Sequence, residues 1–156
     1  MRPRMLKNSL KPEEITELLE SRKVGHLATL GEDGPYAVPI NYILMDGKVY
    51  LHGRKAGGQK LDNIRANPRI CFEVFNEVSY KTGPTACGTG TLYQSAIGRG
   101  TAKILPDGDP LIGAALLKFA EKFATHIKDP VIDPAKLAIT AVIELTIDRW
   151  TGKYNQ

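Results

Sequence analysis

Only two residues, Asp46 and Gly47, separate the strand-like segments 36–44 and 48–52 of this sequence. An Asp-Gly pair in this position is typical of a tight β-hairpin, and so short a connection can join only antiparallel neighbours. A third strand-like segment, residues 24–30, precedes them across the turn Gly-Glu-Asp-Gly. This part of the chain is therefore expected to form an antiparallel meander.

The rest of the chain adds elements in an order that favours a barrel. Apolar spacing predicts helices at 12–22, 59–65 and 111–125, strands at 69–78, 92–104 and 138–148, and a long Ser-, Thr- and Gly-rich loop at 79–91. The helices cannot all serve as parallel crossovers, so a doubly wound sheet is not expected. The pattern predicts a mostly β fold, a six-stranded antiparallel barrel with peripheral helices.

Length and composition fit one domain without metal or disulfide. With 156 residues and 42% hydrophobic content, we expect a single domain over residues 1–156, with a flexible N-terminus at residues 1–11. Cys71 and Cys87 stand outside any CxxC pattern, and the three histidines show no zinc-ligand spacing, so no metal site is predicted. No apolar run approaches the roughly 18 residues of a membrane span, which predicts a cytoplasmic protein without a membrane partner.

Residues 49–68 combine a strand-like run, a basic glycine loop and a helix start. Gly53, Gly57 and Gly58 allow backbone N–H groups to approach an anion, and Arg54 and Lys60 supply positive charge. The spacing matches neither the Walker pattern nor GxGxxG. The segment therefore predicts either a phosphate site, of the kind that holds a flavin nucleotide, or a solvated basic loop.

The net charge of +4 is concentrated around residues 54–69 and 99–103. Nucleic acid or a phosphorylated small molecule would each explain such clusters. Few aromatic residues are interleaved with these cations, so stacking on bases is disfavoured and a small molecule is preferred.

Several motifs occur in a familiar order: GHLAT, VPINYILMDGKVYLHG, GGQKLDNIRANPRICFEV, YQSAIGRGTA, and a final strand before WTGK. In this order they resemble the flavin-binding split-barrel superfamily related to pyridoxamine 5′-phosphate oxidase, and most of all its nitroimidazole-resistance (Nim) type proteins. The likeness spans about residues 13–153. It implies a six-stranded split barrel that forms a homodimer, with FMN in a groove at the subunit interface.

The resemblance assigns cofactor contacts to particular residues. Two strand segments match those that line the flavin ring, and they contain His26, Leu27, Ala28, Thr29, Val38, Pro39, Ile40 and Asn41. The resemblance assigns phosphate binding to Gly53, Arg54 and Lys60, whereas Lys55 is expected to face water. Pro39 is informative by itself, because a proline within a strand is tolerated mainly at an edge or bulge.

Further contacts are expected from the later strands, either from a partner subunit or from across the same groove. Tyr93, Ser95 and Arg99 are candidates to complete the site, although Arg99 also fits a surface strand residue. Its neighbours Gly98 and Gly100 indicate a close approach or a bulge. Trp150 is expected to flank the flavin or to fill the dimer seam.

His52 lies at the end of its predicted strand. Nim-like proteins carry a substrate-side histidine at the end of the matching strand. A histidine titrates near neutral pH, so it is a candidate proton donor, but a structural hydrogen-bonded histidine fits the same position. The resemblance also implies that the loop carrying Cys87 covers the groove, whereas Cys71 is expected in the core.

These features predict an FMN-dependent oxidoreductase. Reduced flavin would pass a hydride to a small electrophile such as a 5-nitroimidazole, with a proton from His52 or water and electrons from NAD(P)H or a reduced-flavin supplier. The tail lacks the Arg-x-His motif of pyridoxamine phosphate oxidases, which disfavours vitamin B6 oxidation. A non-catalytic flavin store or sensor is the alternative, and a barrel that binds single-stranded nucleic acid is the least favoured.

Overall fold

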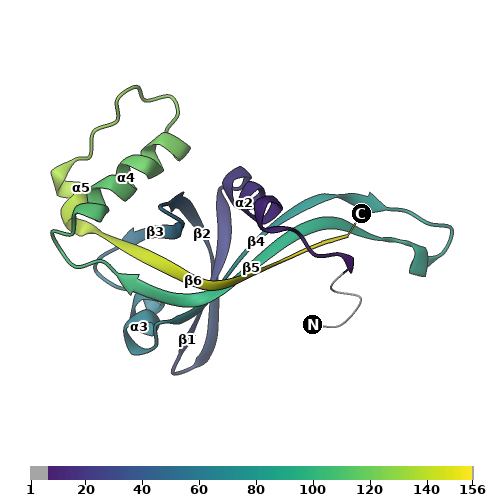
Figure 1. Cartoon of the computed structure of the whole chain (residues 1–156). Helices are drawn as coiled ribbons and strands as arrows, with labels where there is room; N and C mark the ends of the chain where they lie inside the picture. Colours follow the sequence, from purple (N-terminus) through teal and green to yellow (C-terminus); the bar gives the residue numbers. More distant parts are fainter. Residues whose placement is uncertain (1–6, 156) are drawn as a thin grey trace.

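In the computed structural model, which describes residues 7–155, six antiparallel strands form a closed barrel in the order β1-β2-β3-β6-β5-β4 (Figure 1). The strands are β1 (Val24–Gly31), β2 (Gly34–Met45), β3 (Lys48–Arg54), β4 (Arg69–Lys81), β5 (Gly90–Ile104) and β6 (Thr140–Asn155). The helices are α2 (Pro12–Ser21), α3 (Gln59–Ala66), α4 (Pro110–Phe123), α5 (Pro134–Ile139) and the short η1 (Ala86–Gly88). The predicted barrel with peripheral helices is confirmed.

The hairpin at residues 46–47 is confirmed. Asp46 and Gly47 both have positive φ angles, 51° and 73°, as a two-residue turn with the twist of its flanking strands requires. Beyond this turn β2 pairs with β3 in register from Met45 opposite Lys48 to Tyr42 opposite Leu51.

Three predicted boundaries were wrong. The loop expected at 79–91 is shorter, because β4 runs to Lys81 and β5 begins at Gly90, with a register shift between Glu77 and Ser79. These residues extend a long arm beside β6, which itself continues to Asn155 rather than ending near 148 (Figure 1). The six-residue helix α5 was missed, since one and a half turns carry too little apolar periodicity to detect.

The interior of the barrel holds the main core. Alternate strand residues point inward, among them Leu27, Phe72 and Ile143, each fully buried. Helix α2 contributes Ile15, Leu18 and Leu19 to this core, and α3 contributes Leu61 and Ile64. Cys71 was expected here, but it alternates with the buried Ile70 and Phe72 and lies half-buried on the outer face.

Part of the predicted flexible N-terminus is anchored to β6, whereas residues 1–6 lie outside the described residues. Leu10 is 7% exposed, and its amide donates to the carbonyl of Gly152 at 3.2 Å. The amide of Tyr154 donates to the carbonyl of Asn8 at 2.9 Å.

A membrane-crossing helix needs about 20 apolar residues, and no helix within residues 7–155 combines the necessary length and hydropathy.

Strand β2 changes its partner halfway along. Its residues 34–41 pair with β1, and its residues 42–45 pair with β3. Past Leu51, β3 therefore pairs only with β6, through residues 52–54 opposite 140–142. The two neighbouring strands part beyond Tyr42 and Leu51, and this parting is the split in the barrel. Pro39 lies within it, where the β2–β3 ladder needs no donor.

Helix α4 covers the outer face of β2, β3 and β6 with a second core. Its buried residues Ile112, Ala115 and Phe119 pack on Ile43, Tyr50 and Val142. Asp109 caps the helix by accepting a hydrogen bond from the Leu111 amide at 3.0 Å. The helix is thereby fixed beside the split, with Phe119 next to the end of β3.

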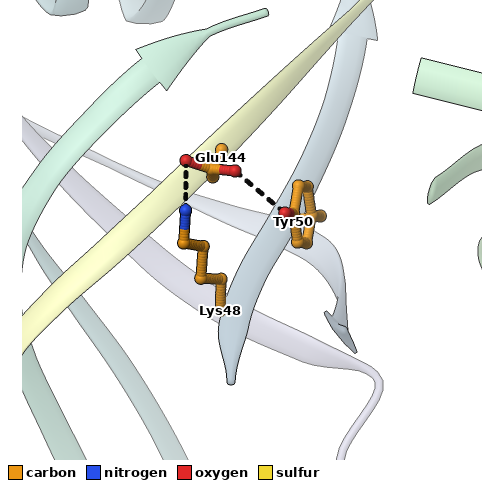
Figure 2. Close-up of polar contacts among 3 residues, drawn as sticks. All are labelled: Lys48, Tyr50 and Glu144. Carbon is orange, nitrogen blue, oxygen red and sulfur yellow. Dashed lines mark hydrogen bonds and ion pairs between the residues drawn. The ribbon is translucent and has the colours of Figure 1, made fainter. Parts of the chain in front are cut away.

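A charged network joins β3 to β6 (Figure 2). Glu144 on β6 is 8% exposed, and its carboxylate accepts hydrogen bonds from Lys48 Nζ at 2.8 Å and from the Tyr50 hydroxyl at 2.9 Å. Burial by itself raises the pKa of Glu144, but the two hydrogen bonds and the charges of Lys48 and Lys103 outweigh it and leave the pKa lowered. Burial and the bond to Glu144 raise the pKa of Tyr50 to about 12.

We expect Glu144→Gln to destabilise the protein by about 1–2 kcal/mol at pH 7, because the amide keeps one hydrogen bond but leaves Lys48 without its carboxylate. A carboxylate whose pKa is lowered by folding stabilises the native state fully above its unfolded-state pKa, and this contribution is lost as pH falls through the folded-state value. Urea unfolding at a series of pH values measures this. The free energies of unfolding of wild type and variant should converge as the pH falls from 7 to below 4.

The matched control is Glu121→Gln, whose exposed carboxylate pairs with Lys118 at 3.3 Å. This substitution should change stability by less than about 0.5 kcal/mol. A Glu144→Gln deficit that is equally large at every pH would contradict the network's charge dependence.

Candidate functional site

A cavity of about 320 Å³ lies in the split between β2 and β3, where α3 begins. Its walls come from three segments: Tyr36, Val38, Pro39 and Ile40 on β2; His52, Gly53 and Arg54 on β3; and Gly57, Gly58, Gln59, Lys60 and Leu61 at the start of α3. Two cations and one imidazole line it, and no aspartate or glutamate does. We call it the cationic cavity, and its electrostatics favour an anion.

The two cations of this cavity have no acidic partner among residues 7–155. Lys60 and Arg54 form none of the ion pairs found there, whereas the neighbouring Lys55 pairs with Asp107 at 2.5 Å. The expectation that Lys55 faces water is confirmed, since the residue is exposed, and its ammonium also pairs with the exposed Asp107 carboxylate. Burial lowers the pKa of Lys60, as expected for a half-buried ammonium without a counter-ion.

Three glycines keep the backbone of the cationic cavity accessible. Gly57 and Gly58 have φ angles of 107° and 130°, and no atom lies within 4 Å of the position that a Cβ would take. A Cβ at Gly53 would lie 3.3 Å from Lys60 Nζ and would crowd the ammonium. Gly58 is also the N-cap of α3, and no side-chain hydrogen bond caps this end. Backbone donors there remain available to an outside acceptor.

Helix α3 is tied to the barrel by a buried polar contact. Asn63 is 6% exposed, and its Nδ2 donates to the Thr29 hydroxyl oxygen at 2.9 Å. Gly31 is required beside it, because a Cβ there would lie 2.3 Å from Asn63 Oδ1. This contact fixes α3, and with it Lys60, relative to β1.

His52 lies at the end of β3, at the junction of two cavities. The residue as a whole is exposed, but its imidazole packs edge-on against Phe119 with ring centroids 4.3 Å apart. Burial of the ring, followed by the charge of Lys60, lowers the pKa of His52. The imidazole is therefore neutral at pH 7 and offers one hydrogen-bond donor and one acceptor.

A second cavity, of about 390 Å³, adjoins the cationic cavity and shares Pro39, Ile40 and His52 with it. Its other walls are Val24 and Asn41, so three apolar residues line it together with the Asn41 amide and the His52 imidazole. We call it the apolar cavity after its Val24, Pro39 and Ile40 walls. Together the two cavities form a groove that is cationic at one end and uncharged at the other.

The structure brings all eight predicted contacts on β2, β3 and α3 to this groove. Those that line it are Val38, Pro39, Ile40, Asn41, His52, Gly53, Arg54 and Lys60. Val24, Tyr36, Gln59 and Leu61 line it as well and were missed by the sequence analysis. Val24 and Tyr36 belong to predicted strands, and Gln59 and Leu61 belong to the predicted helix. The alternation of side chains along those strands was the sequence signal that could have placed Val24 and Tyr36 on the face of the groove.

The predicted β1 residues divide between two faces. Leu27 is fully buried and Thr29 is 4% exposed, so both face the barrel interior, and Thr29 accepts from Asn63. His26 and Ala28 face outward, as the two-residue period of a strand requires. The His26 Nδ1 atom is buried without a hydrogen-bond partner and lies 3.6 Å from Glu73 Oε2, while the ring stacks on Phe75 at 6.2 Å.

The predicted β5 and β6 residues lie away from the groove within one chain. Tyr93, Ser95 and Arg99 are on β5 and line none of the cavities described here. Trp150 packs beside the core, where a Cβ at Gly98 would lie 2.8 Å from its ring. The bulge and the close approach predicted from Gly98 and Gly100 are both confirmed. The β5–β6 register shifts between Arg99 and Gly100, and a Cβ at Gly100 would lie 1.9 Å from the Thr146 carbonyl oxygen.

A family-wide sequence profile described as "Pyridoxamine 5'-phosphate oxidase" matches residues 11–154. Among curated proteins, the chain is 28% identical over 78 residues to a Rhizobium meliloti (strain 1021) protein named "Uncharacterized protein RA0666". The matched segment covers 50% of each chain, so the alignment spans about half the length of that curated relative.

Solved structures share the fold over nearly the whole chain. A Bacteroides thetaiotaomicron VPI-5482 protein assigned to 5-nitroimidazole antibiotic resistance has a TM-score of 0.77 at 20% identity, covering 94% of this chain and 86% of that one. An FAD- and haem-binding protein from Mycobacterium smegmatis has a TM-score of 0.80 at 20% identity, covering 96% and 74%. An FAD-binding protein from Mesorhizobium loti has a TM-score of 0.67 at 25% identity, covering 95% and 97%.

Replacing Lys60 tests the electrostatics of the groove without any ligand. Because the Lys60 charge is one of the two causes that lower the pKa of His52, Lys60→Met should raise that pKa part of the way towards its ordinary value of 6.5, while burial of the ring remains. A pH titration of the His52 imidazole by NMR measures the change.

Arg65→Met is the control, since Arg65 lies on the same helix and pairs with Asp62 at 2.8 Å. It should leave the His52 titration where it is in the wild type. A Lys60→Met titration that coincides with the wild type would show that the ammonium does not act on the imidazole.

Proposed function

The chain belongs to the pyridoxamine 5′-phosphate oxidase family, and from this premise we propose that it is a cytoplasmic flavin-dependent oxidoreductase that binds FMN, or the FMN portion of a longer flavin nucleotide, in the groove. The observation that carries the proposal is the half-buried Lys60 ammonium. It lies over Gly53 in a cavity with no carboxylate and has no counter-ion within the described chain.

The cationic cavity fits a phosphate group. A phosphate dianion would take charge-assisted hydrogen bonds from Lys60 and Arg54, each contributing about 1.5–3 kcal/mol. The open backbone at Gly57 and Gly58 would add N–H donors at the positive end of α3. A ligand of this charge would supply the counter-ion that Lys60 lacks.

The apolar cavity fits a flat ring. Val24, Pro39 and Ile40 supply apolar walls, and Asn41 and His52 supply the few polar groups that orient such a ligand. A bound flavin would supply hydride transfer at its N5 atom. His52, neutral at pH 7, would position a substrate by hydrogen bonding, and water would supply the proton that the reduced product takes up.

A second copy of the chain is part of the proposal. Tyr93, Ser95 and Arg99 lie on the outer face of β5, so in a homodimer they would complete the groove of the opposite copy. The outer face of β4 nearby carries exposed apolar side chains, with Phe75 at 47%, Val78 at 61% and Tyr80 at 65% exposure. A patch of this kind is typical of an interface.

A small electrophile is the proposed substrate, with 5-nitroimidazoles the first compounds to examine. The fold similarity to the Bacteroides protein assigned to 5-nitroimidazole resistance supports this choice. His52, which is proposed to position the substrate, borders both cavities of the groove.

Removing both cations of the cationic cavity should weaken FMN binding strongly. We expect Lys60→Ala and Arg54→Ala each to raise the FMN dissociation constant about tenfold or more, because each deletes a charge-assisted hydrogen bond. Titration of flavin-free protein, followed by quenching of flavin fluorescence, measures the constant.

Arg65→Ala is the matched control, because it removes an exposed cation of α3 that pairs with Asp62. Its FMN affinity should equal that of the wild type. A double Lys60→Ala, Arg54→Ala variant with unchanged FMN affinity would overturn the phosphate assignment.

Steady-state turnover distinguishes an enzyme from a flavin store. With NADH or NADPH and a panel of nitroaromatics, we expect continuous consumption of the nitro compound. His52→Ala should lower kcat about 100-fold, because the hydrogen bond that positions the substrate is lost. A store would instead show one equivalent of reduction per bound flavin and no further cycling, which would contradict the oxidoreductase proposal.

A further inference from the structure

The His52 imidazole is held by one aromatic contact and by no hydrogen bond. Within residues 7–155 neither of its ring nitrogens takes part in a hydrogen bond or an ion pair. The imidazole instead meets the Phe119 ring in a T-shaped contact, with centroids 4.3 Å apart and planes at 80°. Both nitrogens are therefore available to a ligand in the groove.

A histidine that acts through its nitrogens needs a neighbouring group that fixes the plane of its ring. In many active sites a carboxylate or a carbonyl does this by accepting a hydrogen bond, and that nitrogen is then occupied. An aromatic ring in T-shaped contact also restrains the plane, and it occupies neither nitrogen. The Phe119 contact thus leaves His52 one donor and one acceptor for a substrate.

The fold holds Phe119 beside His52 from several sides. Strand alternation places Tyr50 and His52 on the same face of β3, and Val142 lies opposite His52 on β6. Helix α4 covers this face, and its Phe119 is 5% exposed in the second core together with Tyr50 and Val142. One turn later Phe123 stacks on Phe119, with centroids 5.8 Å apart and planes at 24°. The position of the Phe119 ring is therefore set by packing.

Phe119 lines neither the cationic cavity nor the apolar cavity, whereas His52 lines both. A ligand in the groove is therefore in reach of His52 and not of Phe119. Any influence of the Phe119 ring on such a ligand must pass through the imidazole.

We propose that Phe119 is a positioning residue, whose ring fixes the orientation of the His52 imidazole and with it the hydrogen bond from His52 to the substrate. The inference rests on the proposed function and adds to it a residue outside the groove. Without the Phe119 ring, the imidazole turns away from the substrate and becomes more exposed to water.

The first test follows His52 in the flavin-free protein, so it depends on neither cofactor nor turnover. Because burial is the main cause of the lowered pKa of His52, Phe119→Leu should raise this pKa part of the way towards 6.5. An NMR titration of the imidazole measures the change. The control Ile112→Ala removes apolar contacts from the same core two turns earlier on α4, and it should leave the titration unchanged.

The second test asks whether Phe119 acts through His52. With a nitroaromatic substrate, Phe119→Leu should lower kcat about tenfold, because the hydrogen bond to the substrate is misplaced, and should leave the FMN dissociation constant unchanged. In the His52→Ala background the same substitution should lower kcat no further, since the group that it positions is gone. Phe119→Met refills the second core without a ring and should show the same kinetic pattern, so the test does not depend on one variant.

Wild-type kcat in both Phe119 variants would overturn the inference and leave the proposed function intact. A tenfold loss that persists in the His52→Ala background, or the same rise of the His52 pKa in Ile112→Ala, would overturn it as well, because the effect would then be a general loosening of the core. Absence of turnover in the wild type would overturn the proposed function instead. In that case an unchanged His52 titration in Phe119→Leu would still overturn the contact on which the inference depends.

Discussion

The change of partner along β2 is the constraint on which the rest of this structure depends. Because β2 pairs with β1 up to Asn41 and with β3 from Tyr42 onward, the end of β3 is left to pair with β6 alone. The barrel closes around its core and still opens a gap on its wall. The groove lies in that gap, so the same backbone arrangement that completes the fold also supplies the site.

The features that could be predicted from the sequence are those set by residues close together along the chain. The hairpin at Asp46-Gly47, the glycines before α3 and the cations Arg54 and Lys60 are local signals, and all lie where the sequence indicated. The predicted contacts at Leu27 and Thr29 ignored strand alternation, which turns both into the interior. The partners of Lys55 and Thr29, namely Asp107 and Asn63, are distant in sequence, and only the fold brings them together.

Side-chain hydrogen bonds hold the elements on both sides of the groove in place. Asn63 and Thr29 fix α3 against β1, and Glu144 with Lys48 and Tyr50 fixes β3 against β6. Both flanks of the split are thus held by buried hydrogen bonds rather than by loop contacts. The backbone that carries Lys60 and Arg54 is thus fixed on both flanks of the groove.

The pairing of β3 with β6 also has a consequence for biosynthesis. On the side of β3 away from β2, Val49–Arg54 pair with residues 140–145. While the ribosome is still adding the intervening segment, this side of β3 is therefore an unpaired edge. Such an edge can pair with other nascent chains, and contacts this distant in sequence form slowly. Exposure of this edge during translation is therefore the consequence of building the wall of the groove from strands so far apart in the sequence.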